Sequence, residues 1–256
     1  MTTVVSIDVA CEDGRVATAR DELAPLSARS AILSLMLGAH PSPLTPADLT
    51  RAGQLFGIAP ATVRVAVTRA VGDGDLRRTD AGYRLGERLI QRQAHQDEAV
   101  HTADKPWDGT WEMAVVVTTG RPGPERAVLR DALKAHRLAE LREGVWTRPA
   151  NLQRPRFTDP VLQAFTATPE QDPGELAASL WDLTGWAREG ERLLERLSTT
   201  PEPALRLATA AAIVRHLSAD PLLPVGLRPS DWPAVDLRET YSAYQRELSE
   251  LAALPR

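Results

Sequence analysis

The 256-residue sequence predicts an α+β protein built from three parts. Short stretches with helical periodicity, followed by a hairpin pattern, fill the N-terminal third. A strand–helix–strand pattern occupies the middle, and the last third contains only helical patterns separated by proline-rich breaks. We therefore expect a leader over 1–25, a first domain over 26–103, a middle domain over 104–172 and a helical C-terminal domain over 173–256.

Two helices are expected in the first domain before a central turn. Ser27 suits the N-cap of the first, in which apolar residues recur from position 32 to position 37. Thr45 suits the N-cap of the second, and Pro46 suits its first helical position because the proline ring fixes φ. Gly57 then provides the turn into a third helix.

The stretch 60–85 completes the pattern of a winged helix-turn-helix. Pro60 suits the start of the third helix, and Val63, Val67 and Ala70 repeat at three- and four-residue spacing. Two short strand patterns around a turn at Asp80 then predict a basic hairpin. Three helices followed by such a wing are typical of proteins that bind double-stranded DNA.

The outer side of the third helix and the hairpin carry the candidate DNA contacts. Arginine on a helix suits guanine in the major groove, and arginine on a hairpin suits phosphates or the minor groove. An ordinary solvated helix followed by a hairpin is the alternative interpretation. The expected DNA-binding residues are Thr62, Arg64, Val65, Thr68, Arg69, Arg77, Arg78 and Arg84.

The distribution of charge agrees with this local role. The whole chain has a formal net charge of −4, which argues against a protein that coats nucleic acid with its entire surface. Residues 58–92, in contrast, contain seven arginines and four acidic residues, a net charge of +3. The segment with the predicted recognition helix and wing is therefore net positive within a net-negative chain.

The middle domain reads as a small α+β sandwich of the ferredoxin-like kind. A strand over 111–118 follows a Trp-Asp-Gly-Thr-Trp motif, and a helix is expected over 125–140. A second strand is expected at 145–147, and a third near 165–168. One strand, one helix and further strands in this order fit the ferredoxin-like pattern.

The C-terminal third reads as helical. Helices are expected over 176–197, 204–217 and 237–254, with a proline-rich loop over 220–233. A further helix over 86–101 is expected to leave the wing.

Composition limits the compartment and the chemistry. No apolar run approaches the roughly 20 residues that a membrane span needs, and the first ten residues do not resemble a secretory signal. Cys11 is the only cysteine, which excludes an internal disulfide and a multi-cysteine metal site. We expect a cytoplasmic protein with no membrane partner.

Ordered motifs along most of the chain resemble the PaaX-like transcriptional repressors, which control phenylacetic acid degradation. Each motif alone is weak, but their order and spacing are specific. The motifs are Arg29-Ser30, Phe56-Gly57-Ile58, Val63-Arg64-Val65-Ala66 with Arg69, Gly82-Tyr83-Arg84-Leu85, Trp107-Asp108-Gly109-Thr110-Trp111, Leu129-Arg130 with Leu133, Gly144-Val145-Trp146-Thr147-Arg148-Pro149, Leu180-Trp181-Asp182-Leu183, Asp220-Pro221-Leu222-Leu223-Pro224 and Asp231-Trp232-Pro233.

The resemblance implies a homodimeric DNA-binding repressor that an aryl-CoA thioester releases from DNA. It implies the same three parts: a winged helix, a ferredoxin-like middle domain and a helical C-terminal domain. Two departures leave an aryl-CoA or another acyl-CoA open as the effector. The recognition helix is followed by no tryptophan, and the middle helix runs through His136-Arg137-Leu138 where the family has Gly-Phe.

Candidates for effector binding lie in the middle and C-terminal domains. Arginine can clamp phosphate with two hydrogen bonds, and tryptophan can line a pocket for an aryl or acyl group, although core packing is the ordinary role of such residues. The candidates are Arg148, Arg154, Arg156, Trp181, Trp186 and Trp232.

The sequence contains no motif for catalysis, and we expect no enzyme, no cofactor and no metal site. Phosphate-binding glycine loops, HExxH and Gly-x-Ser-x-Gly are absent, and the five histidines are scattered. A metal-dependent nuclease of the Cas2-like kind is one alternative, but the strand that ends at Val117-Thr118-Thr119-Gly120 lacks the expected aspartate. A non-catalytic protein-interaction module, marked by Trp107, Trp111 and Trp146, is the other.

Overall fold

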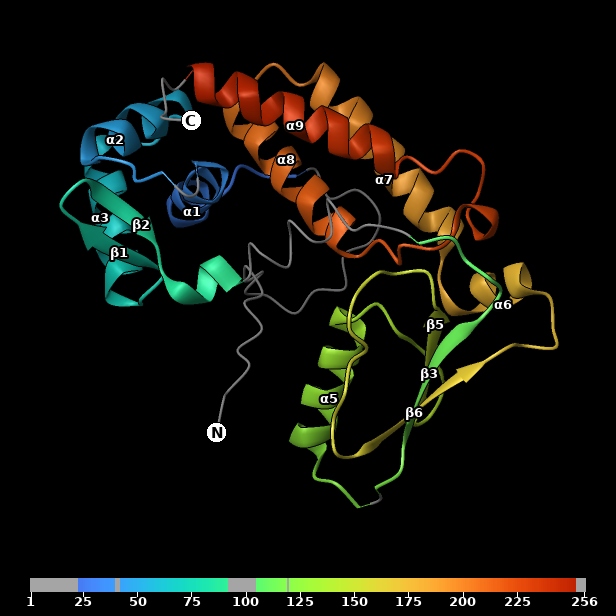
Figure 1. The fold of residues 1–256 in the computed structure, drawn as a ribbon. Coiled ribbons are helices and arrows are strands. Elements are labelled where there is room, and N and C mark those ends of the chain that lie inside the picture. Colours follow the sequence, from blue (N-terminus) through green and yellow to red (C-terminus); the bar gives the residue numbers. More distant parts are fainter. Residues whose placement is uncertain (1–22, 40–41, 92–104, 119, 252–256) are drawn as a thin grey trace. The chain divides into compact units, whose positions relative to one another are not determined.

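Three short helices and a two-stranded hairpin form the N-terminal part of the protein (Figure 1). The computed structural model describes residues 23–39, 42–91, 105–118 and 120–251. The helices are α1 (Ala28–Ala39), α2 (Pro46–Leu55) and α3 (Pro60–Gly72), and the strands are β1 (Leu76–Thr79) and β2 (Gly82–Leu85).

The starts of these helices follow from local chemistry. At α1 the Ser30 N–H donates to Ser27 Oγ (3.2 Å). At α2 the Asp48 N–H donates to Thr45 Oγ1 (3.1 Å) while the Thr45 N–H donates to Asp48 Oδ2 (2.9 Å), which is a capping box. At α3 Pro60 occupies the first helical position, as predicted.

The hairpin β1–β2 is antiparallel and is tied to the segment before α2. Leu44 and Tyr83 exchange two backbone hydrogen bonds, of 3.0 and 2.8 Å. Gly82 has a φ of +131°, and a Cβ at this position would lie 2.4 Å from the Leu44 carbonyl oxygen. Only glycine satisfies both constraints, so this close approach fixes where the hairpin sits against the helices.

Apolar residues from all five elements fill the core of this part. Helix α3 packs on both α1 and α2, and the hairpin packs against α3 through β1 and against α1 through β2. The buried residues include Ile32, Leu35, Met36, Leu49, Val63, Val67, Ala70, Leu76 and Leu85.

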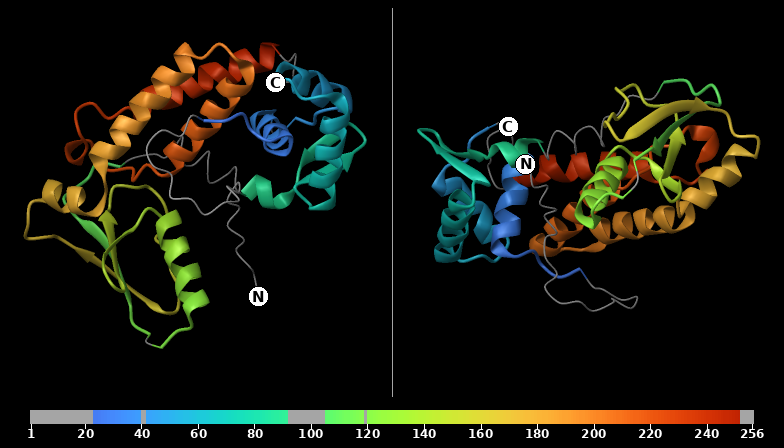
Figure 2. Two further views of the ribbon diagram at one scale, coloured as in Figure 1. Left: turned by 180° about the vertical axis from the view of Figure 1, so that it is seen from behind. Right: turned by 90° about the horizontal axis from the view of Figure 1, so that it is seen from below.

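A four-stranded antiparallel sheet forms the middle of the chain. Its strands are β3 (Trp111–Val116), β4 (Ala139–Arg142), β5 (Val145–Pro149) and β6 (Leu162–Ala167), in the order β4-β5-β3-β6. Helix α5 (Gly123–Ala135) connects β3 to β4 and covers one face of the sheet (Figures 1 and 2). Leu129 and Leu133 of α5 pack there against Ala114 and Trp146.

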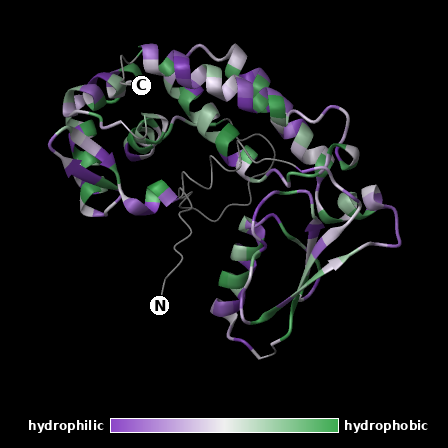
Figure 3. Ribbon diagram, viewed as in Figure 1, coloured by the Kyte–Doolittle hydropathy of each residue, from purple (hydrophilic) through white to green (hydrophobic). Residues whose placement is uncertain are grey.

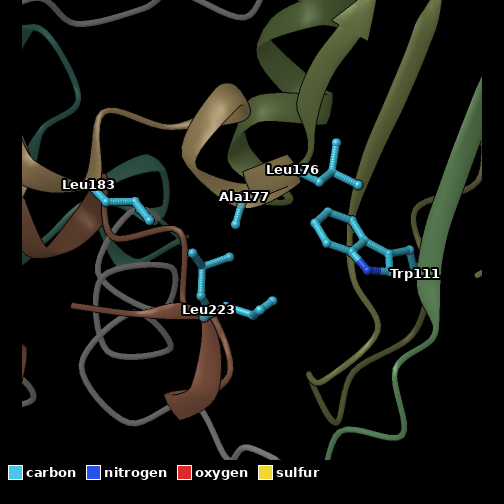
Figure 4. Close-up of a cluster of buried hydrophobic side chains, with 6 residues drawn as sticks. Trp111, Leu176, Ala177, Leu183 and Leu223 are labelled. Carbon is cyan, nitrogen blue, oxygen red and sulfur yellow. The ribbon is translucent and has the colours of Figure 1, made fainter. Parts of the chain in front are cut away.

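Four helices form the C-terminal third: α6 (Pro173–Leu180), α7 (Leu183–Thr199), α8 (Pro203–Ser218) and α9 (Ala234–Leu251), with a short 3-10 turn at Val225–Leu227. Helices α8 and α9 lie side by side (Figure 2). Leu176, Ala177, Leu183 and Leu223 form one buried apolar cluster with Trp111, the first residue of β3 (Figure 4).

The described residues group into two compact units whose boundaries interleave. One unit comprises 101–189 and 219–233, and the other comprises 5–100, 190–218 and 234–256. The C-terminal third therefore contributes to both units. The division into three consecutive domains stays a prediction.

The structure corrects three of the predicted elements. The helix expected over 125–140 ends at Ala135, because Arg137 adopts a φ of +60° and the chain turns into β4. The helix expected over 176–197 is two helices, because Trp181 is extended and Asp182 Oδ1 accepts the Gly185 N–H (2.8 Å) to start α7. The first strand ends at Val116 and not at Thr118.

Several expectations concern residues that the structure does not describe. The leader lies almost wholly outside the described residues, and so does most of the helix expected over 86–101, of which 87–91 are helical. Within the described part of the chain, no helix has the length and apolar character needed to cross a membrane.

Candidate nucleic-acid interface

Helix α3 has one buried side and one exposed side. Val63, Ala66, Val67 and Ala70 are buried against α1 and α2. The α3 residues predicted to contact DNA all lie on the exposed side of the helix. They are Thr62, Arg64, Val65, Thr68 and Arg69.

The two arginines of α3 are available for an external partner. Among the residues that the structure describes, neither Arg64 nor Arg69 forms a side-chain hydrogen bond or an ion pair. The Thr68 hydroxyl donates to the Arg64 carbonyl oxygen (2.8 Å), so it offers a neighbouring ligand only its acceptor lone pairs. The exposed side of α3 thus presents two guanidinium groups, with the short side chains of Val65 and Thr68 between them.

The hairpin adds a second group of cations beside this helix, and its ribbon is largely hydrophilic (Figure 3). Arg77 and Arg78 are exposed and have no ion-pair partner in the described ranges, whereas Arg84 is half-buried and has other interactions. Arg77 pairs directly with Arg84 across the hairpin. Like charges in directly opposed positions destabilise a sheet, so this pair is more useful for binding an anion than for folding.

Asp75 anchors the hairpin to the helices. Its side chain is 2% exposed and pairs with Arg29 of α1 and with Arg88, which follows β2. Arg29 also pairs with the exposed Asp73, and hydrogen bonds to Asp73 and then Asp75 raise the pKa of its guanidinium. The Gly86 N–H donates to the Asp75 carbonyl oxygen (2.7 Å), so side chain and backbone both hold the base of the hairpin.

Sequence reasoning missed this anchor. Asp75 lies in a Gly-Asp-Gly-Asp turn, where acidic residues are ordinarily solvated. Its partners Arg29 and Arg88 lie 46 and 13 positions away along the chain, so no local pattern marks Asp75 as buried and paired.

The predicted effector residues do not form one cluster. Arg148 is 0% exposed, and its guanidinium donates to the carbonyl oxygens of Pro149 (3.0 Å) and Leu222 (3.1 Å) and to Asn151 Oδ1 (3.0 Å). These bonds hold the 219–233 loop to the end of β5. In this conformation Arg148 is not accessible to a phosphate.

Arg154 and Arg156 make local contacts. Arg154 donates to the His136 carbonyl oxygen (2.6 Å) and lies 3.9 Å from a Glu112 carboxylate oxygen. Arg156 is exposed and donates to Thr166 Oγ1 (2.9 Å). Of the three candidate arginines, Arg156 is the most accessible to a ligand.

The three candidate tryptophans lie together. The Trp186 and Trp232 rings stack with centroids 4.1 Å apart and an interplanar angle of 14°. Trp181 and Trp232 also pack against the cluster around Trp111. All three are half-buried, so part of each ring contributes to the core.

The described residues contain no group of three or more His, Cys, Asp or Glu side chains that could hold a metal ion. Val117 and Thr118, which follow the first strand of the middle sheet, provide no carboxylate.

Comparison with known proteins identifies the family. A family model described as PaaX-like protein matches residues 27–89, and one described as the PaaX protein central Cas2-like domain matches residues 104–161. The chain belongs to the PaaX-like family. The match over 27–89 includes every element from α1 to β2, and with them the exposed side of α3 and the Asp75 anchor. Membership of the PaaX-like family supports a regulator-type role.

One solved structure is similar over nearly the whole chain. It is that of an uncharacterized protein, Rv0674, from Mycobacterium tuberculosis, with 43% sequence identity and a TM-score of 0.80. The similarity covers 89% of this chain and 97% of that one. A comparison with curated proteins found no match.

Proposed function

We propose that this PaaX-like protein is a sequence-specific transcriptional regulator in which α1, α2, α3 and the β1–β2 hairpin form a winged helix-turn-helix. The observation that carries the proposal is the division of α3. Its buried side fills the core, and its exposed side holds Arg64 and Arg69 without partners among the described residues. Such a helix suits the major groove, where arginine binds guanine through two hydrogen bonds.

The hairpin has a complementary role in this proposal. Arg77 and Arg78 are exposed on β1, the strand that packs against α3. In this proposal they contact phosphates, and such contacts fix the register of the protein on the duplex. Asp75, which lies two positions before Arg77, is buried and paired with Arg29 and Arg88. It therefore does not repel the DNA backbone at the protein surface.

The protein acts in this proposal as a homodimer, because one α3 reads only one half-site. The strand order β4-β5-β3-β6, with α5 after the first strand, agrees with a ferredoxin-like middle domain. We assign dimerisation to this domain. Two copies would place two recognition helices on half-sites separated by about one turn of DNA or a multiple of it.

An aryl-CoA or acyl-CoA thioester is proposed as the effector that releases a repressor from DNA. The stacked Trp186–Trp232 pair and Trp181 are the best candidates for the aryl or acyl group, and Arg156 is the best candidate for a phosphate. The thioester weakens DNA binding if it binds more tightly to a dimer whose helix spacing does not fit the half-sites. The role is regulatory and not enzymatic, and it is exercised in the cytoplasm.

A binding experiment tests this proposal. The purified protein is titrated against duplex DNA from upstream of its own gene and against unrelated duplex, at several salt concentrations. Tight binding to the first duplex alone, with a steep loss of affinity as salt rises, is the expected result. Equal weak binding to both would refute the regulator. Cleavage of either duplex after addition of Mg²⁺ or Mn²⁺ would favour the nuclease alternative instead.

A further inference from the structure

Val65 lies at the centre of the exposed side of α3. Successive residues of an α-helix are about 100° apart around the axis. On that basis Val65 points about 150° away from the mean direction of the four buried residues Val63, Ala66, Val67 and Ala70, with Arg64 about 100° to one side of it and Arg69 about 40° to the other. The Val65 side chain is 50% exposed.

The fold itself gives no reason for a valine at this position. Of the three other valines in α3, Val63 and Val67 are 1% and 6% exposed and pack in the core, and Val71 in the last turn is half-buried. A β-branched residue restricts its own rotamers in a helix and has a lower helix propensity than alanine. Val65 therefore carries this cost while half of its surface stays in water, and such departures from local rules are typical of functional positions.

We propose that Val65 recognises the C5-methyl group of thymine in the major groove, between the bases that Arg64 and Arg69 contact. This inference rests on the proposed DNA-binding function. Of the four bases, only thymine presents a methyl group in that groove. A short apolar side chain between two long cationic ones can contact the methyl group while the guanidinium groups extend past it to the neighbouring guanines.

The preferred half-site is thus expected to contain a thymine close to guanine. Arginine alone would select guanine and would tolerate any base at the intervening position. Contact with the methyl group adds a preference for thymine there, because it removes apolar surface of both groups from water. Val65 is then a specificity-determining residue.

The experiment uses deoxyuridine, which differs from thymidine only in the missing methyl group. Duplexes are first selected from a random-sequence pool with the full-length wild-type protein. Each thymine of the selected sequence is then replaced singly by uracil, and Kd is measured for wild type and for Val65→Ala. Val128→Ala is the matched control, because Val128 is a 47% exposed valine on helix α5.

For wild type we expect one position in each half-site where uracil weakens binding by about fourfold, the value of one buried methyl group. Val65→Ala should bind the thymine duplex about as weakly as wild type binds the uracil duplex. Replacing that thymine by uracil should cause Val65→Ala no further loss of affinity. Val128→Ala should behave as wild type throughout, and circular dichroism should show that Val65→Ala keeps its helical content.

Two results would overturn the inference while leaving the proposed function intact. One is a wild-type protein that binds its selected sequence with no uracil-sensitive position. The other is a Val65→Ala variant that retains the same uracil sensitivity as wild type. Failure of the wild-type protein to enrich any sequence would instead refute the proposed DNA-binding function, and the inference with it.

Discussion

Replacing Asp75 by asparagine tests whether a buried carboxylate holds the hairpin to the helices. The Asp75 side chain is 2% exposed and pairs with both Arg29 and Arg88. Asparagine has nearly the same shape but no charge, so the substitution removes the two ion pairs and leaves the packing intact. We expect the protein to lose stability.

The size of the stability loss in Asp75→Asn follows from how exposed its two arginine partners are. Breaking a buried ion pair costs about 3–5 kcal/mol when the remaining charge stays buried. Here the remaining groups are the side chains of Arg29 and Arg88, which are 38% and 50% exposed and regain water, and Arg29 keeps Asp73. The expected loss is therefore about 1.5–3 kcal/mol, the range for hydrogen bonds to charged groups.

The control is Asp73→Asn, which removes a carboxylate from the same arginine at the surface. Asp73 is 55% exposed, so its substitution should change the free energy of unfolding by less than about 0.5 kcal/mol. Urea unfolding of both variants, followed by far-ultraviolet circular dichroism at neutral pH, provides the comparison. If Asp75→Asn costs no more than Asp73→Asn, the anchor does not stabilise the hairpin and the reasoning is wrong.

Three further predictions follow. Arg64→Ala and Arg69→Ala should each weaken binding to a selected duplex by about 1–3 kcal/mol and relax the base preference; unchanged affinity in both, measured by fluorescence anisotropy, would mean that α3 does not read bases. Arg77→Ala should weaken binding to every duplex alike and reduce the slope of log K against log salt by about one, and a loss confined to one sequence would contradict a phosphate contact. Gly82→Ala should cost about 1–3 kcal/mol, because the new Cβ would lie 2.4 Å from a carbonyl oxygen and φ is +131°. Gly72→Ala, where nothing lies within 4 Å of a new Cβ, should cost nothing in the same thermal melts.

The sequence predicted best those features that depend on local chemistry. The N-cap at Thr45 and the start of α3 at Pro60 are confirmed, because the side chains that make them lie within three residues of the helix start. The division of α3 into a buried and an exposed side is confirmed for the same reason. A helical period of about 3.6 residues assigns each side chain to a side without knowledge of the rest of the fold.

The elements that the sequence did not predict depend on tertiary contacts. Strand β4 (Ala139–Arg142) contains alanine, glutamate, leucine and arginine, all good helix formers, and is a strand because it pairs with β5. The break between α6 and α7 falls where Trp181 packs against the cluster around Trp111. The pairing with β5 and the packing on the cluster around Trp111 cannot be predicted from the periodicity of β4 or of the segment around Trp181, because a periodic pattern depends only on neighbouring residues in the sequence.

The arginines show why a candidate site is harder to predict than a fold. In the sequence, Arg148 and Arg64 look alike, each following an apolar or β-branched residue in an ordered element. In the structure, Arg148 is 0% exposed and binds two backbone carbonyl oxygens, which satisfies part of its charge inside the protein. Arg64 is exposed and has no ion pair within the described residues, so its guanidinium retains the full capacity to bind an anion or a guanine.

This division follows from geometry that residue type does not encode. A buried guanidinium must receive acceptors from the fold, because leaving it unpaired costs several kcal/mol, and Leu222 supplies one of them from 74 positions further along the chain. An exposed guanidinium exchanges protein acceptors for water and can exchange water for DNA. Arg64 and Arg69 of α3 can therefore form new hydrogen bonds with a partner. Mutating Arg148 should disturb the loop at 219–233, because the Arg148 guanidinium donates to the Leu222 carbonyl oxygen.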